Sequence, residues 1–164
     1  MKTGLELKRI SDENGYEEST RVIKKAFSTV ANEFNLTKEN APTNAAFIEA
    51  DALGMMQDKG IEMFGVYESD KQIGFVALEK ANDSLYYMEK LAVLPEYRHK
   101  GTGKAILDFV LDYVENRNGT KISIGIVNEN IRLKNWYSDY GFKETSIKKY
   151  EHLPFTVCFM EKLI

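Results

Sequence analysis

The first 60 residues contain one short stretch in which apolar and polar residues alternate, followed by two stretches in which apolar residues recur at helical spacing. Residues 5–10 alternate apolar and polar side chains, which predicts a short strand. Apolar residues then recur at helical spacing over 22–34, after a break at Asn14-Gly15, and again over 47–56. We therefore expect one strand followed by two helices.

Beyond residue 60, short apolar runs between polar turns replace the helical period. Six of these runs predict strands, and two helical stretches lie among them. Gly119 is expected to end the first of these two helices in the left-handed conformation. The expected strands cover residues 63–67, 73–78, 85–93, 122–127, 143–149 and 156–162, and the expected helices begin near residues 102 and 130.

This order of elements indicates a mixed α/β (α+β) fold in a single domain covering residues 1–164. A length of 164 residues suffices for one substantial core, and the sequence shows no internal repeat or linker.

Composition narrows the functional classes. Apolar residues make up 43% and charged residues 29% of the chain, as in ordinary globular proteins. The net charge of −3 argues against a nucleic-acid partner, because binding phosphate backbones needs a basic surplus. No apolar run is long enough for a signal peptide or a membrane span, and the single cysteine forms no internal disulfide. We expect a cytoplasmic protein with no membrane partner, and two histidines with one distant cysteine predict no metal site.

The segment 91–104 has the character of a phosphate-binding loop. It leads from an apolar strand, through a turn with Gly101 and Gly103, into an amphipathic helix. Backbone amides at the start of a helix lack internal partners and attract anions. The loop fits neither a Walker motif, since Ala105 replaces the required Ser or Thr, nor the dinucleotide fingerprint, since Ile106 replaces a small residue. Basic or potentially basic side chains surround the glycines: Arg98, His99, Lys100 and Lys104.

Two motifs together resemble those of the GNAT superfamily of N-acetyltransferases. Residues 98–103, Arg-His-Lys-Gly-Thr-Gly, match the acyl-CoA signature Arg/Gln-x-x-Gly-x-Gly/Ala. Residues 130–142 match a second motif, Asn-x6-Tyr-x3-Gly-Phe. The order of elements also agrees along nearly the whole chain, although the first 60 residues carry no matching motif. The resemblance implies a central, mostly antiparallel, twisted sheet of about six to seven strands, splayed at the CoA site and with helices on both faces.

The resemblance also implies acetyl-CoA as co-substrate, with no metal. The pantetheine arm would lie along the strand that ends at Val93, whose N–H is a candidate oxyanion donor. The pyrophosphate would contact the loop amides. The implied CoA-binding residues are Leu91, Ala92, Val93, Arg98, His99, Lys100, Gly101, Thr102, Gly103, Lys104, Asn130 and Tyr137.

Glu89 and Tyr137 are the candidate catalytic residues. An alkyl amine arrives protonated, and Glu89 is the candidate base because period-two alternation places it on the face of Leu91 and Val93. The alternative is a solvated carboxylate paired with Lys90 or Lys80, and Glu79 is the next candidate base. The resemblance implies that Tyr137 protonates the departing thiolate; the alternative is a tyrosine packed at the edge of the core.

The expected function is acetyl transfer from acetyl-CoA to a primary amine of a small molecule, peptide or protein by direct attack. The alternative is a non-catalytic CoA-binding regulatory domain with the same fold. Acidic residues in the N-terminal part would favour a cationic acceptor, unless they form only a solvated face. His152 is a candidate for contact with the acceptor, against a role in a turn, and Cys158 is expected to be a buried apolar residue. Pairing through the C-terminal strands, common among relatives, makes a homodimer a further expectation.

Overall fold

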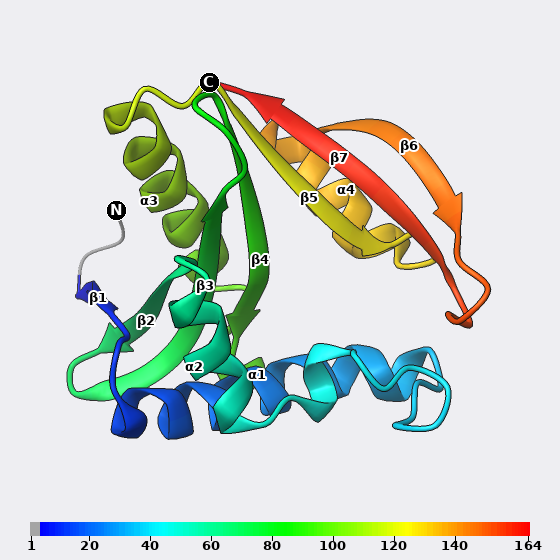
Figure 1. The fold of residues 1–164 in the computed structure, drawn as a ribbon, viewed down its shortest axis with the longest axis horizontal. Coiled ribbons are helices and arrows are strands. Elements are labelled where there is room, and N and C mark those ends of the chain that lie inside the picture. The colour runs from blue at the N-terminus through cyan, green and yellow to red at the C-terminus, as the bar shows by residue number, and fades with distance from the viewer. Residues whose placement is uncertain (1–3) are drawn as a thin grey trace.

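The structure is a computed structural model that describes residues 4–164, and it forms one seven-stranded mixed sheet with four α-helices (Figure 1). The strand order is β1-β2-β3-β4-β5-β7-β6. This confirms the predicted α+β fold with a mostly antiparallel sheet. The elements are β1 (Leu5–Arg9), α1 (Glu13–Glu33), the 3-10 turn η1 (Ala45–Phe47), α2 (Ala50–Asp58), β2 (Glu62–Glu68), β3 (Lys71–Lys80), β4 (Leu85–Val93), the 3-10 turn η2 (Pro95–Tyr97), α3 (Thr102–Asn116), β5 (Lys121–Val127), α4 (Ile131–Tyr140), β6 (Lys143–Lys149) and β7 (Thr156–Leu163).

The starts of the first two helices differ from the prediction. α1 begins at Glu13 and includes the Asn14-Gly15 pair, because the Asp12 carboxylate caps the helix and accepts a hydrogen bond of 2.8 Å from the Gly15 N–H. The second apolar stretch is divided between a 3-10 turn and a shorter α-helix. α2 starts only at Ala50.

Gly119 has a different role from the one expected. The left-handed residue after α3 is Asn118, with φ of 64°. A Cβ on Gly119 would lie 2.4 Å from a methyl carbon of Val114 and 3.0 Å from the ring of Tyr86. Glycine is needed here for space and not for its backbone angle.

The sheet consists of two antiparallel halves joined by a short parallel contact. β1 to β4 pair antiparallel, as do β5, β7 and β6. Between the halves, β4 and β5 pair only over Leu85–Tyr87 and Lys121–Ser123, and beyond this contact the two strands diverge (Figure 1). This divergence confirms the expected splay of the sheet.

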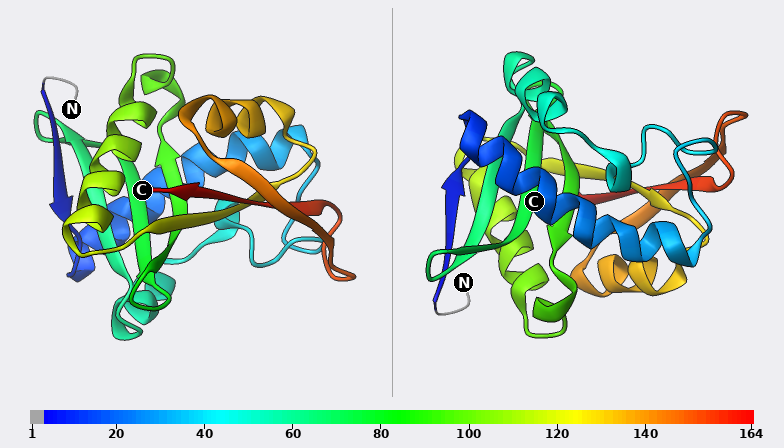
Figure 2. Two further views of the ribbon diagram at one scale, coloured as in Figure 1. Left: turned by 90° about the horizontal axis from the view of Figure 1, so that it is seen from above. Right: turned by 90° about the horizontal axis from the view of Figure 1, so that it is seen from below.

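Helices cover both faces of the sheet. α1 and α2 pack over one face of the first half, on a core that includes Ile23, Leu53 and Phe75. α3 and α4 pack over the other face, on a core that includes Ile106 and Ile122. The two views in Figure 2 show α1 crossing from the β1 side of the molecule to the end that carries α4.

The far end of α1 contacts the second half of the sheet. Phe155, in the loop between β6 and β7, packs on a small apolar cluster that contains Ala31 of α1. An Arg132 nitrogen of α4 lies 3.0 Å from a Glu33 oxygen at the end of α1. α1 therefore spans the open side of the splay. None of the helices in residues 4–164 has the length and apolar character that crossing a membrane requires.

Candidate active site

The divergence of β4 and β5 leaves the lower part of β4 with an unpaired edge. The Leu94 N–H donates to the Ile73 carbonyl of β3 at 2.8 Å, so the backbone N–H of Leu94 points toward β3. Because N–H and C=O directions alternate along a strand, the backbone groups of Val93 and Leu91 point to the opposite side, where β5 has moved away. This edge can accept an added extended ligand.

The loop that follows β4 presents unused backbone amides. Within residues 4–164, no backbone N–H from His99 to Lys104 donates to a protein acceptor. Two left-handed residues shape this loop, His99 with φ of 62° and Gly101 with φ of 84°. The amides lie at the positive end of the α3 dipole, so the loop is suited to bind an anionic group.

The two sequence motifs meet in space at Gly103. A Cβ on Gly103 would lie 2.9 Å from the indole ring of Trp136, which follows the start of α4. The absence of a side chain thus lets α4 pack against the first turn of α3. Trp136 is partly buried and also contacts the Tyr137 ring, with 4.9 Å between the ring centroids.

The guanidinium of Arg98 is bonded to protein groups. It donates to the Val93 carbonyl at 3.2 Å, to Thr29 Oγ1 at 3.0 Å and to the Ala26 carbonyl at 2.8 Å. Burial lowers the pKa of Arg98, with nearby Glu96 acting in the opposite direction. Three of its donors are therefore directed at β4 and α1, and its assignment to CoA binding stays a prediction.

A bulge in β4 interrupts the alternation on which the position of Glu89 was predicted. The register against β3 shifts between residues 89 and 92, so that two residues of β4 oppose one of β3. Within this segment Lys90 has φ of 54°, in a region that is uncommon for residues other than glycine. Because the bulge adds one residue, the side chains that follow it lie on the opposite face of the sheet from the one that regular alternation predicts.

The expectation that Glu89 shares a face with Leu91 and Val93 is wrong for this reason. Glu89 lies opposite Ala77, which belongs to the core beneath α1 and α2. Leu91 and Val93 pack instead on the core beneath α3 and α4. Directly opposed side chains of antiparallel strands share a face, so the Glu89 side chain projects toward the side of α1 and α2.

The surroundings of Glu89 favour a higher proton affinity. Burial raises the pKa of Glu89, Lys90 lowers it, and a hydrogen bond with Glu79 raises it further. The Lys90 ammonium lies 3.7 Å from the Glu89 carboxylate, so the predicted alternative of an ion pair with Lys90 is present in the structure. Lys80 pairs with Asp83 at 3.6 Å.

Tyr137 belongs to the second motif and lies on α4, with its side chain in the core beneath α3 and α4. Its side chain is only 4% exposed, and its ring packs edge-on against Phe142 at 5.3 Å. Burial alone raises the pKa of Tyr137. The phenol is therefore protonated at neutral pH.

The remaining candidates have varied surroundings. Asn130 caps α4, since its side-chain oxygen accepts from the Leu133 N–H at 3.3 Å. His152 is exposed in the loop between β6 and β7, and its ring centroid lies 5.8 Å from that of Tyr150. Cys158 is fully buried, as predicted, and burial raises the pKa of its thiol.

Two acidic residues of the N-terminal part form ion pairs with arginines. Glu18 pairs with Arg21 at 2.5 Å, and Glu33 pairs with Arg132. Among residues 4–164, no three His, Cys, Asp or Glu side chains are placed to hold a metal ion.

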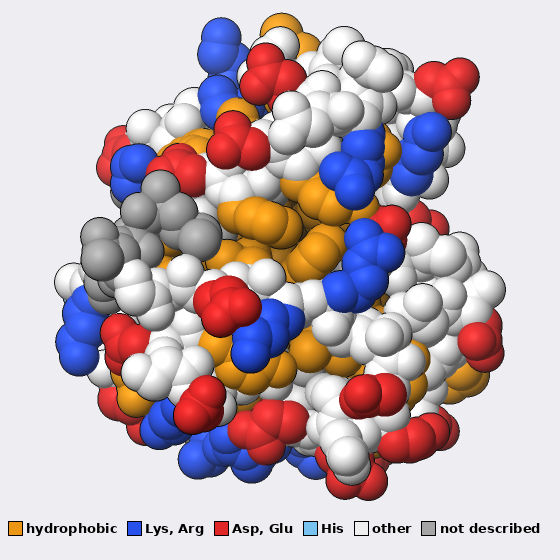
Figure 3. Space-filling view, turned by 90° about the vertical axis from the view of Figure 1, so that its left-hand side faces the viewer, with side chains coloured by type: hydrophobic (Ala, Val, Ile, Leu, Met, Phe, Trp, Pro, Cys, Tyr) orange, Lys and Arg blue, Asp and Glu red, His pale blue; other side chains and the backbone are white. Residues whose placement is uncertain are grey.

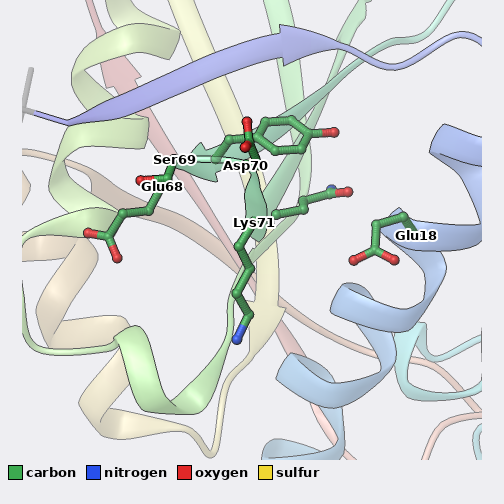
Figure 4. Close-up of a pocket in the computed structure, with 7 residues that line it drawn as sticks. Glu18, Glu68, Ser69, Asp70 and Lys71 are labelled. Carbon is green, nitrogen blue, oxygen red and sulfur yellow. The ribbon is translucent and has the colours of Figure 1, made fainter.

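Two surface hollows are lined by none of the predicted CoA-binding or catalytic residues. Figure 4 shows one between Glu18 of α1 and the β2–β3 turn, where Asp70 and Lys71 lie. Another is lined by residues from the ends of β3 and α3, among them Lys80 and Arg117. On the side that carries β1, hydrophobic side chains form the floor of a depression bordered by charged groups (Figure 3).

Sequence reasoning missed the β4 bulge and the bonds from Arg98 to α1. A lysine in a left-handed conformation leaves no trace in the sequence, and neither does a contact between residues 72 positions apart.

Comparison with known proteins identifies the family. The sequence model of the acetyltransferase (GNAT) domain matches residues 30–162. The chain therefore belongs to the GNAT family and is an N-acetyltransferase that uses acetyl-CoA; its acceptor is not identified.

Solved structures share the fold at low sequence identity. PaiA N-acetyltransferase from Thermoplasma acidophilum, in complex with coenzyme A, is 17% identical with a TM-score of 0.80, and the match covers 98% of this chain and 99% of that one. The ribosomal-protein-S18-alanine N-acetyltransferase from Escherichia coli is 15% identical with a TM-score of 0.77, covering 98% and 94%. A GNAT family acetyltransferase from Elizabethkingia anophelis with acetyl-CoA bound is 13% identical with a TM-score of 0.69, covering 99% and 100%. The comparison with curated proteins found no match.

Proposed function

We propose that the protein acetylates a primary amine by direct attack on acetyl-CoA held between β4 and β5. The observation that carries this proposal is the unpaired edge of β4, which leads directly into a loop of unpartnered amides at the start of α3. Acetyl-CoA supplies an activated acetyl group as a thioester. The protein must hold it, remove a proton from the amine and protonate the leaving thiolate.

The residues present fit a CoA molecule. The backbone of Leu91 would pair with the amide groups of the pantetheine arm, as an added strand would, while the Val93 carbonyl already accepts from Arg98. The amides from His99 to Lys104 would hold the pyrophosphate, and Lys100 would add positive charge, while the Lys104 ammonium is paired with Asp108 at 3.0 Å. The buried hydroxyl of Thr102 lacks a protein partner in this same loop. Two structural neighbours, from Thermoplasma acidophilum and Elizabethkingia anophelis, hold coenzyme A and acetyl-CoA respectively.

Glu89 would accept the proton from the amine. Its raised pKa brings the carboxylate closer to the proton affinity that a general base needs near neutral pH. Its side chain projects toward α1 and α2, so the acceptor would approach from that side of the sheet. His152 would contribute to the acceptor site from the loop between β6 and β7.

Tyr137 would donate a proton to the departing thiolate, and the Val93 N–H would donate to the oxygen of the attacked carbonyl. A phenol that stays protonated at neutral pH suits this role. The acceptor would be an amine of a small molecule, peptide or protein. The Escherichia coli neighbour is named for acetylating an alanine of ribosomal protein S18, and this supports keeping protein termini in the test.

The first test is calorimetric titration with acetyl-CoA, followed by thiol release over a panel of small amines and peptides. Gly101→Ala places a side chain at φ of 84° without a nearby clash, so it should distort the loop and weaken binding about 10-fold while the protein stays folded. Binding together with amine-dependent thiol release supports the proposal. Binding without turnover over the panel would favour a regulatory CoA-binding domain, and no binding by the folded protein would overturn the assigned site.

A further inference from the structure

Arg98 connects the end of β4 with α1, which lies about 70 residues earlier in the sequence. Its guanidinium donates to the Val93 carbonyl at the end of β4 and to two oxygens of α1, those of Ala26 and Thr29. All three donor–acceptor distances lie between 2.8 and 3.2 Å. No carboxylate is among the acceptors, so this contact is a directed fork of hydrogen bonds and not a diffuse ion pair.

The α1 end of this connection is built into the core. Ala26 is 4% exposed and packs with the core residues Phe75 and Ala92. The Thr29 hydroxyl accepts from Arg98 and donates at 2.9 Å to the Ala26 carbonyl, which also accepts from Arg98. Arg98 therefore donates hydrogen bonds to two neighbouring oxygens in one turn of α1.

The other end of the connection is the start of the anion-binding loop. The Arg98 N–H donates to the Pro95 carbonyl at 3.3 Å, which is the last backbone bond before the unpartnered amides. His99 then turns the chain into its left-handed conformation. A ligand that fixes these amides also fixes the backbone of Arg98, and through its side chain the position of α1.

We infer that Arg98 is a positioning residue that couples occupancy of the CoA loop to the ordering of α1, the helix on the side toward which Glu89 projects. This inference rests on the proposed placement of CoA. Binding of acetyl-CoA should stiffen α1 before the acceptor arrives. Because coupling between two binding sites is reciprocal, an acceptor held by α1 should strengthen the binding of CoA by the same factor.

Hydrogen exchange measured by mass spectrometry tests the coupling directly. Exchange is compared with and without saturating acetyl-CoA in the loop (residues 99–104) and in α1 (residues 26–33). In the wild type both segments should slow several-fold. In Arg98→Ala, and in Arg98→Lys if the alanine variant does not fold, the loop should still slow while α1 no longer responds, because a single ammonium cannot reproduce the three-way fork.

Arg132→Ala is the matched control, because it removes an arginine that also bonds α1 but does not touch the loop. Its α1 should respond to acetyl-CoA as the wild type does. The inference is overturned if α1 of the wild type does not respond to bound acetyl-CoA, if an Arg98 variant keeps the response, or if the folded Arg98 variants no longer bind acetyl-CoA. Failure of the wild type to bind acetyl-CoA at all would instead overturn the proposed site.

Discussion

The two halves of the sheet differ in how they are covered. In the first half β3 is buried at every position from Gln72 to Leu78, because α1 and α2 pack on one face and α3 on the other. In the second half β6 has no fully buried residue, and α4 covers one face of the sheet. The candidate site lies where the thickly covered half and the thinly covered half separate.

This difference assigns separate tasks to the halves. The covered half supplies the unpaired edge of β4, the loop amides and Glu89, all of which need fixed positions. The thin half supplies Tyr137 and borders the splay, and only three residue pairs join β5 to β4. Regions with fewer buried contacts open at lower free energy, so the second half is expected to be the less stable part of the sheet.

The largest expected effect tests the covered half itself. Phe75→Ala removes a fully buried ring between β3 and α1, and it should lower the free energy of unfolding by about 3–5 kcal/mol. Ile147→Ala on β6, where the side chain is 48% exposed, should change it by less than about 0.5 kcal/mol. Urea unfolding followed by circular dichroism measures both. Equal losses would show that the halves do not differ in stability.

The next effect concerns Glu89, the proposed base, which lies in the covered half. Glu89→Gln should lower kcat about 100-fold, because the neutral amide cannot accept a proton from the amine. Steady-state thiol release measures this change, and Glu68→Gln in the β2–β3 hairpin is the control that should keep full activity. A kcat within a factor of two of the wild type would leave Glu89 as a partner of Lys90 only.

The pH profile sharpens the assignment of Glu89. Burial raises the pKa of Glu89, so the rate should rise with pH through a midpoint above the ordinary value for glutamate, about 4.3. The active form is the carboxylate, so activity is lost as the pH falls through this midpoint. In Glu89→Gln the acidic limb should disappear. An acidic limb unchanged in the variant would assign the titration to another group.

A smaller effect concerns Tyr137, the proposed acid, which lies in the thin half. Tyr137→Phe should lower kcat about 10-fold and leave acetyl-CoA affinity unchanged, because the ring still fills its place in the core. Tyr140→Phe on the same helix is the matched control, since it removes a hydroxyl bonded to Asp108 at 2.5 Å and should affect stability but not kcat. Equal kinetic effects would mean that both tyrosines act only through packing.

Much of this architecture could be predicted from the sequence, because strands and helices here bury regular faces. The alternation of residues 122–127 and the helical period of α3 follow directly from which side chains meet the core. The loop from Arg98 to Gly103 was found because its glycines and its place before a helix carry their own chemistry. The start of α1 was less well predicted, because capping by Asp12 outweighed the turn preference of Asn14-Gly15.

The orientation of Glu89 could not be predicted for a different reason. Strand alternation gives the face of a residue only while the register is regular, and the bulge at Lys90 reverses it. Arg98 is similar, since its motif position suggested a ligand contact while its bonding partners lie about 70 residues earlier in α1. Such long-range contacts depend on the packed fold and not on local pattern.

The smallest expected effect tests how α1 holds the thin half. Arg132→Ala breaks the exposed pair with Glu33 and should lower the free energy of unfolding by about 0.2–1 kcal/mol. In 1 M salt the difference should shrink, because the screening length falls to about 3 Å. Arg21→Ala is the control, because it breaks an ion pair within α1 that does not link the two halves of the sheet. A loss above about 2 kcal/mol in Arg132→Ala alone would mean that this ion pair holds the thin half more strongly than the packing of Phe155 or the pairing of β5 with β4. The thin half would then be held in place chiefly by α1.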